Sequence, residues 1–420
     1  MFKPNIFSAW DAYGFKSFSN DIFAGICVGC IALPLSMAFA IASGLNPSVG
    51  IFTAIIAGIL IASLGGCKVQ IGGPAGAFIV IVLGIVNTYG VNNLLIITAM
   101  SGVLLFLMGL FRVGGLIKHI PEEVISGFTN GIAVLIFASQ LKDFFGLRLE
   151  IPAEFINNIN AIGHHISESN VLTLTTSLLC LFFLFLWRIT KKYMGILGHI
   201  PEILIVMIVS TTLVYLYQIP VETIGTRFGG IPHHFPSFVV PEIMHFDISK
   251  LWMPICTLAI LGAIESLLCA RVADTITQDQ HNSNQELIGQ GITNFLLPFF
   301  GGMPATGTIA RTVTNIKSGA TSPISGITHS LTLLSIVFFI GDFAKNIPLA
   351  CLASILIYVA WNMGEWKALI WKRNHPLASQ ICLWLVFILT VVFNLGIAIA
   401  TGLVYSVLIH ILKKAINLSK

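Results

Sequence analysis

The sequence predicts an all-α integral membrane protein with fourteen membrane-spanning segments, and three observations carry that prediction. The chain has 420 residues, of which 56% are hydrophobic and only 10% are charged, whereas about 25% are charged in an average soluble domain. Apolar runs such as Val171–Trp187 and Leu251–Cys269 are about as long as a helix must be to cross a hydrocarbon core of roughly 30 Å. Charges, prolines and glycines divide the chain into fourteen hydrophobic segments.

The fourteen segments differ in length in an informative way. They begin near Ile22, Ser48, Pro74, Asn92, Pro121, Asn170, Ile200, Trp252, Glu286, Pro304, Thr321, Pro348, Pro376 and Asn394. The third (Pro74–Thr88) and the tenth (Pro304–Lys317) are too short to span at 1.5 Å per residue. They hold matching places in two halves of seven segments, about 20–218 and 250–415, and GGPAG at 72–76 recurs loosely as GGMPATG at 301–307. Such symmetry is typical of inverted repeats whose discontinuous helices meet at a binding site near the midplane.

The distribution of positive charge predicts the orientation. With fourteen segments and a cytoplasmic N-terminus, most Lys and Arg residues fall in cytoplasmic connections, as the positive-inside rule requires. Those assigned to the outer side are Lys142, Arg148, Arg227, Lys250 and Lys345. We therefore expect a multi-pass protein with both termini in the cytoplasm.

Composition argues against several other classes of protein. The net charge is +4, but the basic residues form no patch for nucleic acid. The eight cysteines are scattered without a spacing that indicates zinc. The outer connections carry His164, His165, His233 and His234, which we interpret as solvated, since no carboxylate spacing fixes a metal geometry. No nucleophile, base and orienting group occur together at membrane depth, so we expect no enzyme activity, no metal and no cofactor.

Two ionisable residues lie at membrane depth, where each must pair, face water or change its protonation state. Glu265 is flanked by apolar residues in LGAIESLLCA and could take up a proton or hold a cation. Alternatively, it is a structural acid bonded to a neighbouring helix. Arg311 lies seven residues beyond Pro304, about two helical turns into the tenth segment. Its guanidinium suits an anion, and the alternatives are snorkelling to the surface or pairing with Glu265.

The Gly- and Pro-rich openings of the two short segments predict a second contribution to anion binding. Backbone N–H groups at a helix start are unsatisfied and lie at the positive end of the helix dipole. The small residues Ala75, Gly76, Ala305, Thr306 and Gly307 would let a ligand approach that backbone. Alternatively, these residues serve close helix packing.

The polar stretch before the ninth segment predicts a helix start. Ser283 and Glu286 have the spacing of a capping box, in which the two side chains bond to each other's backbone N–H groups. This accounts for part of the motif without any role in chemistry.

Taken together, these motifs resemble the SulP anion permeases, whose animal relatives include pendrin and prestin. The resemblance covers nearly the whole chain. It rests on QIGGPAGAF, PEEVISGFTNGIA, GAIESLLCARVADTITQDQHNSNQELIGQG, GGMPATGTIARTVTNIKSGATSPISG and IPLACLASILIYVAWNM. The whole chain, 1–420, therefore looks like one SulP-type transmembrane domain, with no STAS domain within it.

The resemblance implies seven-plus-seven inverted repeats divided into a core domain and a gate domain, with elevator-like movement of the core and a possible homodimer. It places the anion between the two half-helices, near Phe39, Ala75, Gly76, Ala310 and Arg311. It also makes Glu265 the residue that couples to a proton, or to sodium where the family has Asp.

We therefore expect a secondary transporter of a small anion in a bacterial-type inner membrane. The substrate is sulfate, bicarbonate or a dicarboxylate, and the coupling ion is a proton. A sodium-coupled bicarbonate symporter and an anion channel or exchanger stay open as alternatives.

Overall fold

The computed structural model describes most of the chain. The described residues are 4–8, 13–117, 121–149, 152, 154–193, 195, 200–232, 234–242, 248–370, 376–393, 397–398, 401–402 and 404–405. The predicted fourteenth segment falls mostly outside these residues, as do both chain ends and His233.

The described residues are mostly helical, as predicted. The first half contains α1 (Asn5–Ser8), α2 (Phe15–Ala42), α3 (Pro47–Leu64), β1 (Gly72–Gly73), η1 (Gly76–Phe78), α4 (Ile79–Leu110), α5 (Gly114–Ile117), α6 (Glu122–Phe145), α7 (Phe155–His165), η2 (Ile166–Glu168), α8 (Val171–Thr190), η3 (Lys191–Tyr193), α9 (Glu202–Tyr217) and α10 (Ile224–Phe228). The second half contains α11 (Ile248–Thr277), α12 (Ser283–Leu296), η5 (Leu297–Phe300), β2 (Thr306–Gly307), α13 (Ile309–Lys317), α14 (Ile324–Ala344), α15 (Leu349–Met363), η6 (Trp366–Ala368) and α16 (Leu377–Val392).

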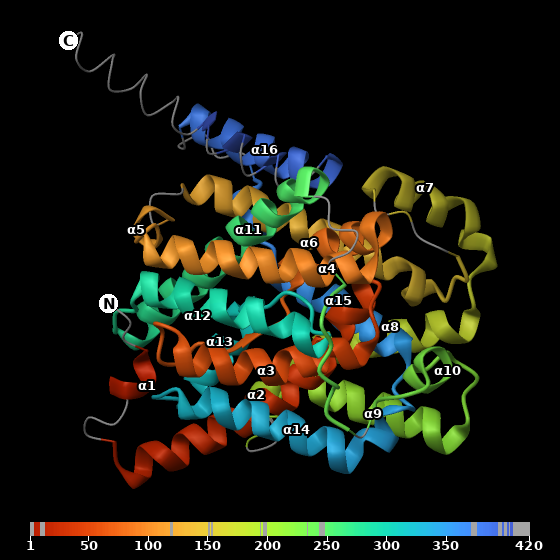
Figure 1. Ribbon diagram of the computed structural model, residues 1–420. Helices are drawn as coiled ribbons and strands as arrows, with labels where there is room; N and C mark the ends of the chain where they lie inside the picture. The colour runs from red at the N-terminus through yellow and green to blue at the C-terminus, as the bar shows by residue number, and fades with distance from the viewer. Residues whose placement is uncertain are drawn as a thin grey trace.

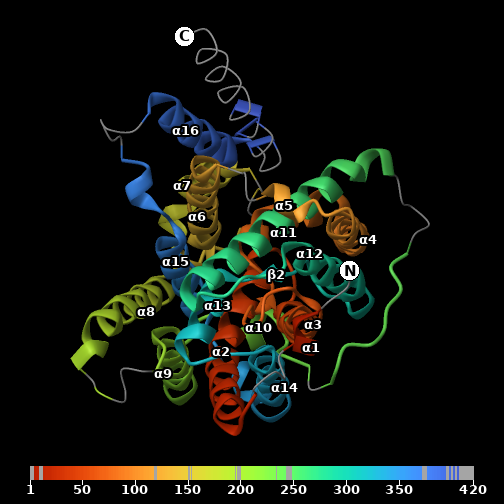
Figure 2. The same cartoon turned by 90° about the vertical axis from the view of Figure 1, so that its left-hand side faces the viewer.

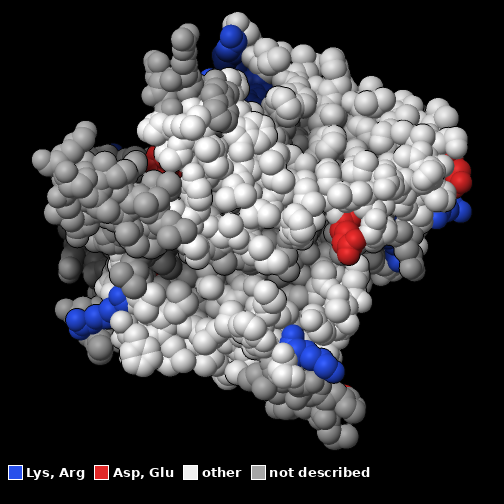
Figure 3. All heavy atoms as spheres, turned by 90° about the horizontal axis from the view of Figure 1, so that it is seen from above, with Lys and Arg blue, Asp and Glu red and all other residues white. Residues whose placement is uncertain are grey.

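The surface of the helices is suited to lipid. Within the described residues, six helical stretches are long and apolar enough to cross a membrane, and α9, α14, α15 and α16 contain shorter apolar helices. On α8 the large side chains of Leu179, Phe182 and Phe183 are at least half exposed, and the face in Figure 3 is almost free of charge. Such surface is expected where hydrocarbon is the solvent.

The helices form two groups (Figures 1 and 2). The core group consists of α2, α3, α4, α11, α12, α13 and α14, which pack mainly against one another. The gate group consists of α6, α8, α9, α15 and α16, with α6 central to it. Each group draws helices from both halves of the chain, which agrees with the predicted core and gate domains.

Small residues bring the core helices close together. A methyl group on Gly25 would lie 2.5 Å from the carbonyl oxygen of Ser325 in α14, and one on Gly29 would lie 2.7 Å from Cβ of Thr332. A methyl group on Gly58 of α3 would lie closer still to Oγ of Ser330. Close backbone approach through small residues is the usual way for membrane helices to associate.

Both short segments predicted from the sequence are short in the structure. Gly90 has φ 82° and ψ 170° inside α4, so the helix of the third segment ends there and the fourth segment follows. The tenth segment contains a helix of only nine residues, α13. Non-helical backbone at this depth is tolerated where protein covers it, and the residues that open both segments are buried.

The connection between α11 and α12 corrects one prediction. The helix starts at Ser283 as expected, but its N-cap is Asn282, whose side chain accepts a hydrogen bond from the backbone N–H of Gln285. Glu286 does not close a capping box, because its carboxylate is bonded to other elements, as described below.

Candidate functional site

The site is built where the two short segments meet. Gly72 and Gly73 pair antiparallel with Gly307 and Thr306, so β1 and β2 form a two-stranded ribbon inside the core group. The ribbon is extended by the bond from the backbone N–H of Thr308 to the carbonyl of Ile71, at 2.9 Å. Because the strands are antiparallel, the chain continues from the two ends of the ribbon in opposite directions toward the two helices.

Both helices start next to the ribbon without a side-chain cap. Ala75 precedes η1, which continues into α4, and Thr308 precedes α13; neither caps its helix. The hydroxyl of Thr308 bonds instead to the carbonyl oxygen of Ile71, at 3.1 Å. The first backbone N–H groups of both helices therefore keep their hydrogen-bonding capacity and the positive end of each dipole.

Arg311 lies in the first turn of α13, not two turns into a helix as the sequence suggested. Residues 304–308 are extended because Thr306 and Gly307 pair with β1, so the helix begins only at Ile309. The side chain of Arg311 is 2% exposed. It therefore does not snorkel to a surface.

The guanidinium of Arg311 has neutral partners. Its Nη2 donates to Oγ of Ser36 at 3.2 Å and lies 3.5 Å from the carbonyl oxygen of Pro74. Nε and Nη1 are buried and have no hydrogen-bond partner among the described residues. No described carboxylate forms an ion pair with this group, Glu265 included. The positive charge is thus fixed in place but not neutralised.

Phe39 and Gly76 lie together at the start of η1. A methyl group on Gly76 would lie 3.6 Å from the Phe39 ring and 3.1 Å from Cδ1 of Ile136, which belongs to α6 of the gate group. Phe39 and Ala75 are each 6% exposed. This part of the candidate site therefore faces the boundary between the core and gate groups.

The remaining predicted residues lie along α11, β2 and α13. Thr306 is fully buried and donates its hydroxyl hydrogen to the carbonyl of Gly262 in α11, at 3.2 Å. Glu265 comes three residues later; it is partly exposed and makes no hydrogen bond within the described part of the chain. Ala310 is exposed, next to Arg311. Within the described residues, the structure therefore gives no support to the alternative of a structural acid bonded to a neighbouring helix.

Close packing accounts for two of the motif glycines. A methyl group on Gly72 would collide with Ile61, and one on Gly307 would collide with the amide of Gln70. At these positions the structure supports the packing interpretation. Gly73 is different, since a methyl group there would meet Nη1 of Arg311.

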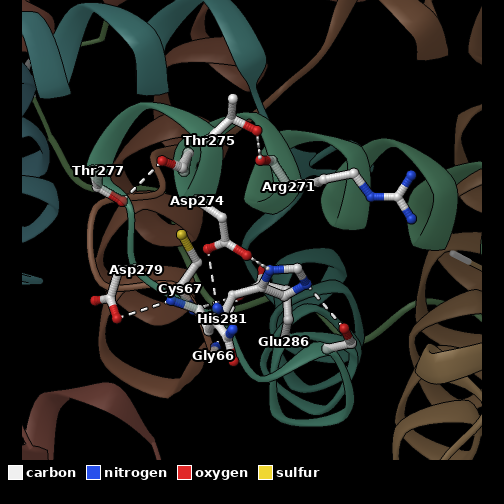
Figure 4. A network of polar contacts seen from close by, with 12 residues as sticks. Gly66, Cys67, Arg271, Asp274, Thr275, Thr277, Asp279, His281 and Glu286 are labelled. Carbon is white, nitrogen blue, oxygen red and sulfur yellow. Dashed lines mark hydrogen bonds and ion pairs between the residues drawn. The ribbon is translucent and has the colours of Figure 1, made fainter.

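Sequence reasoning missed the contacts of Glu286, a fully buried carboxylate (Figure 4). One of its oxygens accepts from the backbone N–H groups of Gly66 and Cys67, at 2.8 and 3.2 Å. The other accepts from Ser266 and Gln290, both at 2.9 Å. With these four donors, the carboxylate joins α12 to α11 and to the loop before β1. The contacts join residues up to 220 positions apart, so no local pattern could have revealed them.

Ser36 and His329 were also missed. Ser36 is fully buried and holds Arg311. His329 of α14 is fully buried beside Gly58, and neither ring nitrogen has a partner among the described residues. Both residues occur in stretches of otherwise apolar or small residues. In such a stretch a polar residue is the feature of the sequence that could have indicated a functional position.

Comparison with known proteins gives a consistent result. The profile of the sulfate permease family matches residues 18–387. The candidate sulfate transporter YvdB of Bacillus subtilis (strain 168) is 44% identical over 393 residues, covering 93% of this chain and 73% of that protein. The bicarbonate transporter BicA of Picosynechococcus sp. is 29% identical over 399 residues, covering 92% of this chain and 69% of that protein.

Solved structures agree with these matches. The transmembrane domain of a cyanobacterial bicarbonate transporter BicA has a TM-score of 0.84 at 27% identity, covering 92% of this chain and 98% of that one. Murine Solute Carrier 26 family member A9 in its inward-facing state has a TM-score of 0.86 at 20% identity, covering 98% and 71%, and shows the same fold. These proteins are membrane transporters and not enzymes. Since the family profile spans most of the chain and a relative at 44% identity covers 93% of it, this chain belongs to the sulfate permease family of anion transporters.

Proposed function

We propose that this protein is a proton-coupled symporter of a small anion, with sulfate, bicarbonate or a dicarboxylate as substrate. The observation that carries the proposal is Arg311, a buried guanidinium with neutral partners beside two uncapped helix starts. A buried charge is costly unless a counter-charge accompanies it. An anion at this place would supply that counter-charge.

Three kinds of group would bind the anion. Arg311 provides charge and directed N–H donors. The helix starts at Gly76 and at Ile309 provide backbone N–H groups and aligned dipoles. Phe39, Ala75, Thr306 and Ala310 would shape the space around it, with Phe39 against Gly76.

Glu265 is the proposed coupling group. It lies one helical turn from Gly262, which contacts Thr306 of the ribbon, and none of the residues that the structure describes forms a hydrogen bond or ion pair with it. A charged carboxylate repels an anion nearby, so the anion binds better when Glu265 is protonated. Linkage makes this reciprocal, so a bound anion favours the protonated form to the same degree.

The relatives keep one alternative open. The match to a sulfate transporter and to bicarbonate transporters keeps both anions open, and in a sodium-coupled bicarbonate symporter Glu265 would serve as a sodium ligand. In that case uptake would follow the sodium gradient. An anion channel or exchanger is a further alternative; the channel predicts ohmic current and no concentrative uptake.

The wider setting of the proposal follows from the fold and the relatives. We place the protein in a bacterial inner membrane, with the core group moving against the gate group like an elevator to give alternating access. A homodimer is the expected assembly. No cofactor is required, because coupling needs only an ion gradient.

Uptake into proteoliposomes tests the proposal. Labelled sulfate, bicarbonate and fumarate are offered in parallel under an inward proton gradient, an inward sodium gradient, or neither. One anion should accumulate above its equilibrium level with the proton gradient alone. Accumulation driven by sodium supports the alternative, and chloride conductance without accumulation contradicts symport.

Two variants assign the roles. Arg311→Ala should lose anion binding and uptake together. Glu265→Gln imitates the protonated acid, so it should bind the anion with nearly wild-type affinity and fail to concentrate it with a proton gradient. Unchanged pH dependence in Glu265→Gln would sink the coupling assignment while leaving the anion site intact.

A further inference from the structure

Ser36 of α2 contacts Arg311 and is fully buried. Its hydroxyl hydrogen is committed to the carbonyl oxygen of Ala32, one turn earlier in the helix, at 2.7 Å. The oxygen is therefore free to act as acceptor, and it accepts from Nη2 of Arg311 at 3.2 Å. With its one donor already used, this hydroxyl has no hydrogen to offer an anion.

Other groups restrict the same end of the guanidinium. The carbonyl oxygen of Pro74 lies 3.5 Å from Nη2, and Gly73 leaves the space that Nη1 occupies. Both of these hydrogen-bond contacts involve Nη2. Nε and Nη1 are buried and have no hydrogen-bond partner in the described part of the chain. The side chain is thus held at one nitrogen and available at two.

We infer that Ser36 is a positioning residue for Arg311, which orients the guanidinium toward the anion without touching the anion itself. This rests on the proposed function. An arginine side chain loses rotamer entropy when it is fixed. A site that fixes it before the ligand arrives spares the ligand that loss.

The chemistry of the partner matters as much as its place. A carboxylate at position 36 would hold the guanidinium equally well but would neutralise its charge, and an anion would then gain little. A hydroxyl orients by hydrogen bonding and leaves the full charge available. Ser36 thus orients the Arg311 guanidinium and leaves its positive charge unneutralised.

Ser36→Ala tests the inference, with Ser43→Ala as a matched control. Ser43 is also fully buried, ends the same helix, and donates to the carbonyl of Phe39 at 2.8 Å in the same i−4 pattern, but has no bond to Arg311. Ser36→Ala should raise the KM for the anion about tenfold, the effect of one hydrogen bond to a charged group. Its kcat should stay within about twofold, and Ser43→Ala should change neither constant.

A double-mutant cycle separates positioning from packing. Arg311→Lys keeps a charge but lacks the planar fork, so adding Ser36→Ala to it should change the KM less than about twofold. An equal loss in both backgrounds, or no loss in the wild-type background, overturns the inference.

Equilibrium binding of sulfate and bicarbonate to the same variants, without any gradient, tests the proposed function and the role of Ser36 separately. A wild-type protein that binds the anion while Ser36→Ala binds it equally well contradicts the inference alone. A wild-type protein that binds none of the anions contradicts the proposed function, and the inference fails with it.

Discussion

Arg311 illustrates how a membrane protein keeps a charge at depth without a countercharge of its own. The guanidinium donates hydrogen bonds to a serine hydroxyl and a backbone carbonyl. Both acceptors are neutral, so they do not cancel its positive charge. The dipoles of that hydroxyl and that carbonyl offset part of the energetic cost of burying the cation, and the proposed anion would supply the missing counter-charge. Affinity for the anion should therefore depend on small changes around the guanidinium.

Gly73→Ala should weaken anion binding while leaving the protein folded. The added methyl group would meet Nη1 of Arg311, which is the far end of a flexible side chain, so the guanidinium would shift and the backbone would stay. We expect the KM to rise about tenfold or more. Gly84→Ala in α4 is the control, because a methyl group there has nothing within 4 Å. A wild-type KM in Gly73→Ala contradicts the described geometry.

At the scale of elements, the division of α4 depends on one residue. Gly90 has φ 82° and no atom near the position of a Cβ, so Gly90→Ala tests backbone strain alone. Backbone at φ 82° and ψ 170° lies in a region that is essentially restricted to glycine, and a residue with a Cβ held there is strained by about 1–3 kcal/mol. The melting temperature in detergent should fall relative to wild type, whereas Gly84→Ala should not lower it. An unchanged melting temperature would show that the break tolerates a side chain.

The connector α10 is held by a small ionic network outside the spanning helices. Arg227 donates to Asp143 at the end of α6, at 2.7 Å, and to Glu222. The hydrogen bond from Arg227 lowers the pKa of Glu222. The same connector joins the loop before α15, through the bond from the backbone N–H of Ile224 to the carbonyl of Ile347 at 3.0 Å. The network therefore ties three parts of one face together.

Arg227→Met should destabilise the protein in a pH-dependent way. Because the pKa of Glu222 is lowered in the folded state, its contribution is present above the ordinary value of about 4.3 and is lost as pH falls through the lowered value. The deficit in melting temperature should be largest near pH 7 and shrink below about pH 4. Lys68→Met, which removes the more exposed pair with Asp279, should have little effect. A constant deficit across pH would contradict the ionic explanation.

The two short segments were predictable because composition and length are local properties. Pro74, Pro304 and the flanking glycines mark where the two short segments open, although the second helix starts only at Ile309. The ribbon of β1 with β2 was not predictable, since two-residue strands carry no periodicity. The same holds for Glu286, whose partners lie as far as 220 residues away. Its spacing from Ser283 matched a capping box, and tertiary contacts overrode that local pattern.

At the scale of the whole molecule, the two groups of helices agree with the predicted division, whereas the number of spans and the orientation stay predictions. Fourteen spans place both termini on one side, and the distribution of Lys and Arg places that side in the cytoplasm. Fluorescent-protein fusions at either terminus should therefore fluoresce, and alkaline phosphatase fusions should be inactive. Opposite results at the two ends would require an odd number of spans.

The pairing of β1 with β2 also bears on how the protein is made. The bond from the backbone N–H of Ile71 to the hydroxyl of Thr312 joins residues 241 positions apart. A ribosome delivers the first half of the chain to the bilayer well before the second, and until then the backbone of residues 71–73 lacks its partners in hydrocarbon. Insertion of this protein therefore includes an interval in which the unpaired backbone of residues 71–73 must be sheltered, by water, by neighbouring helices or by the insertion machinery.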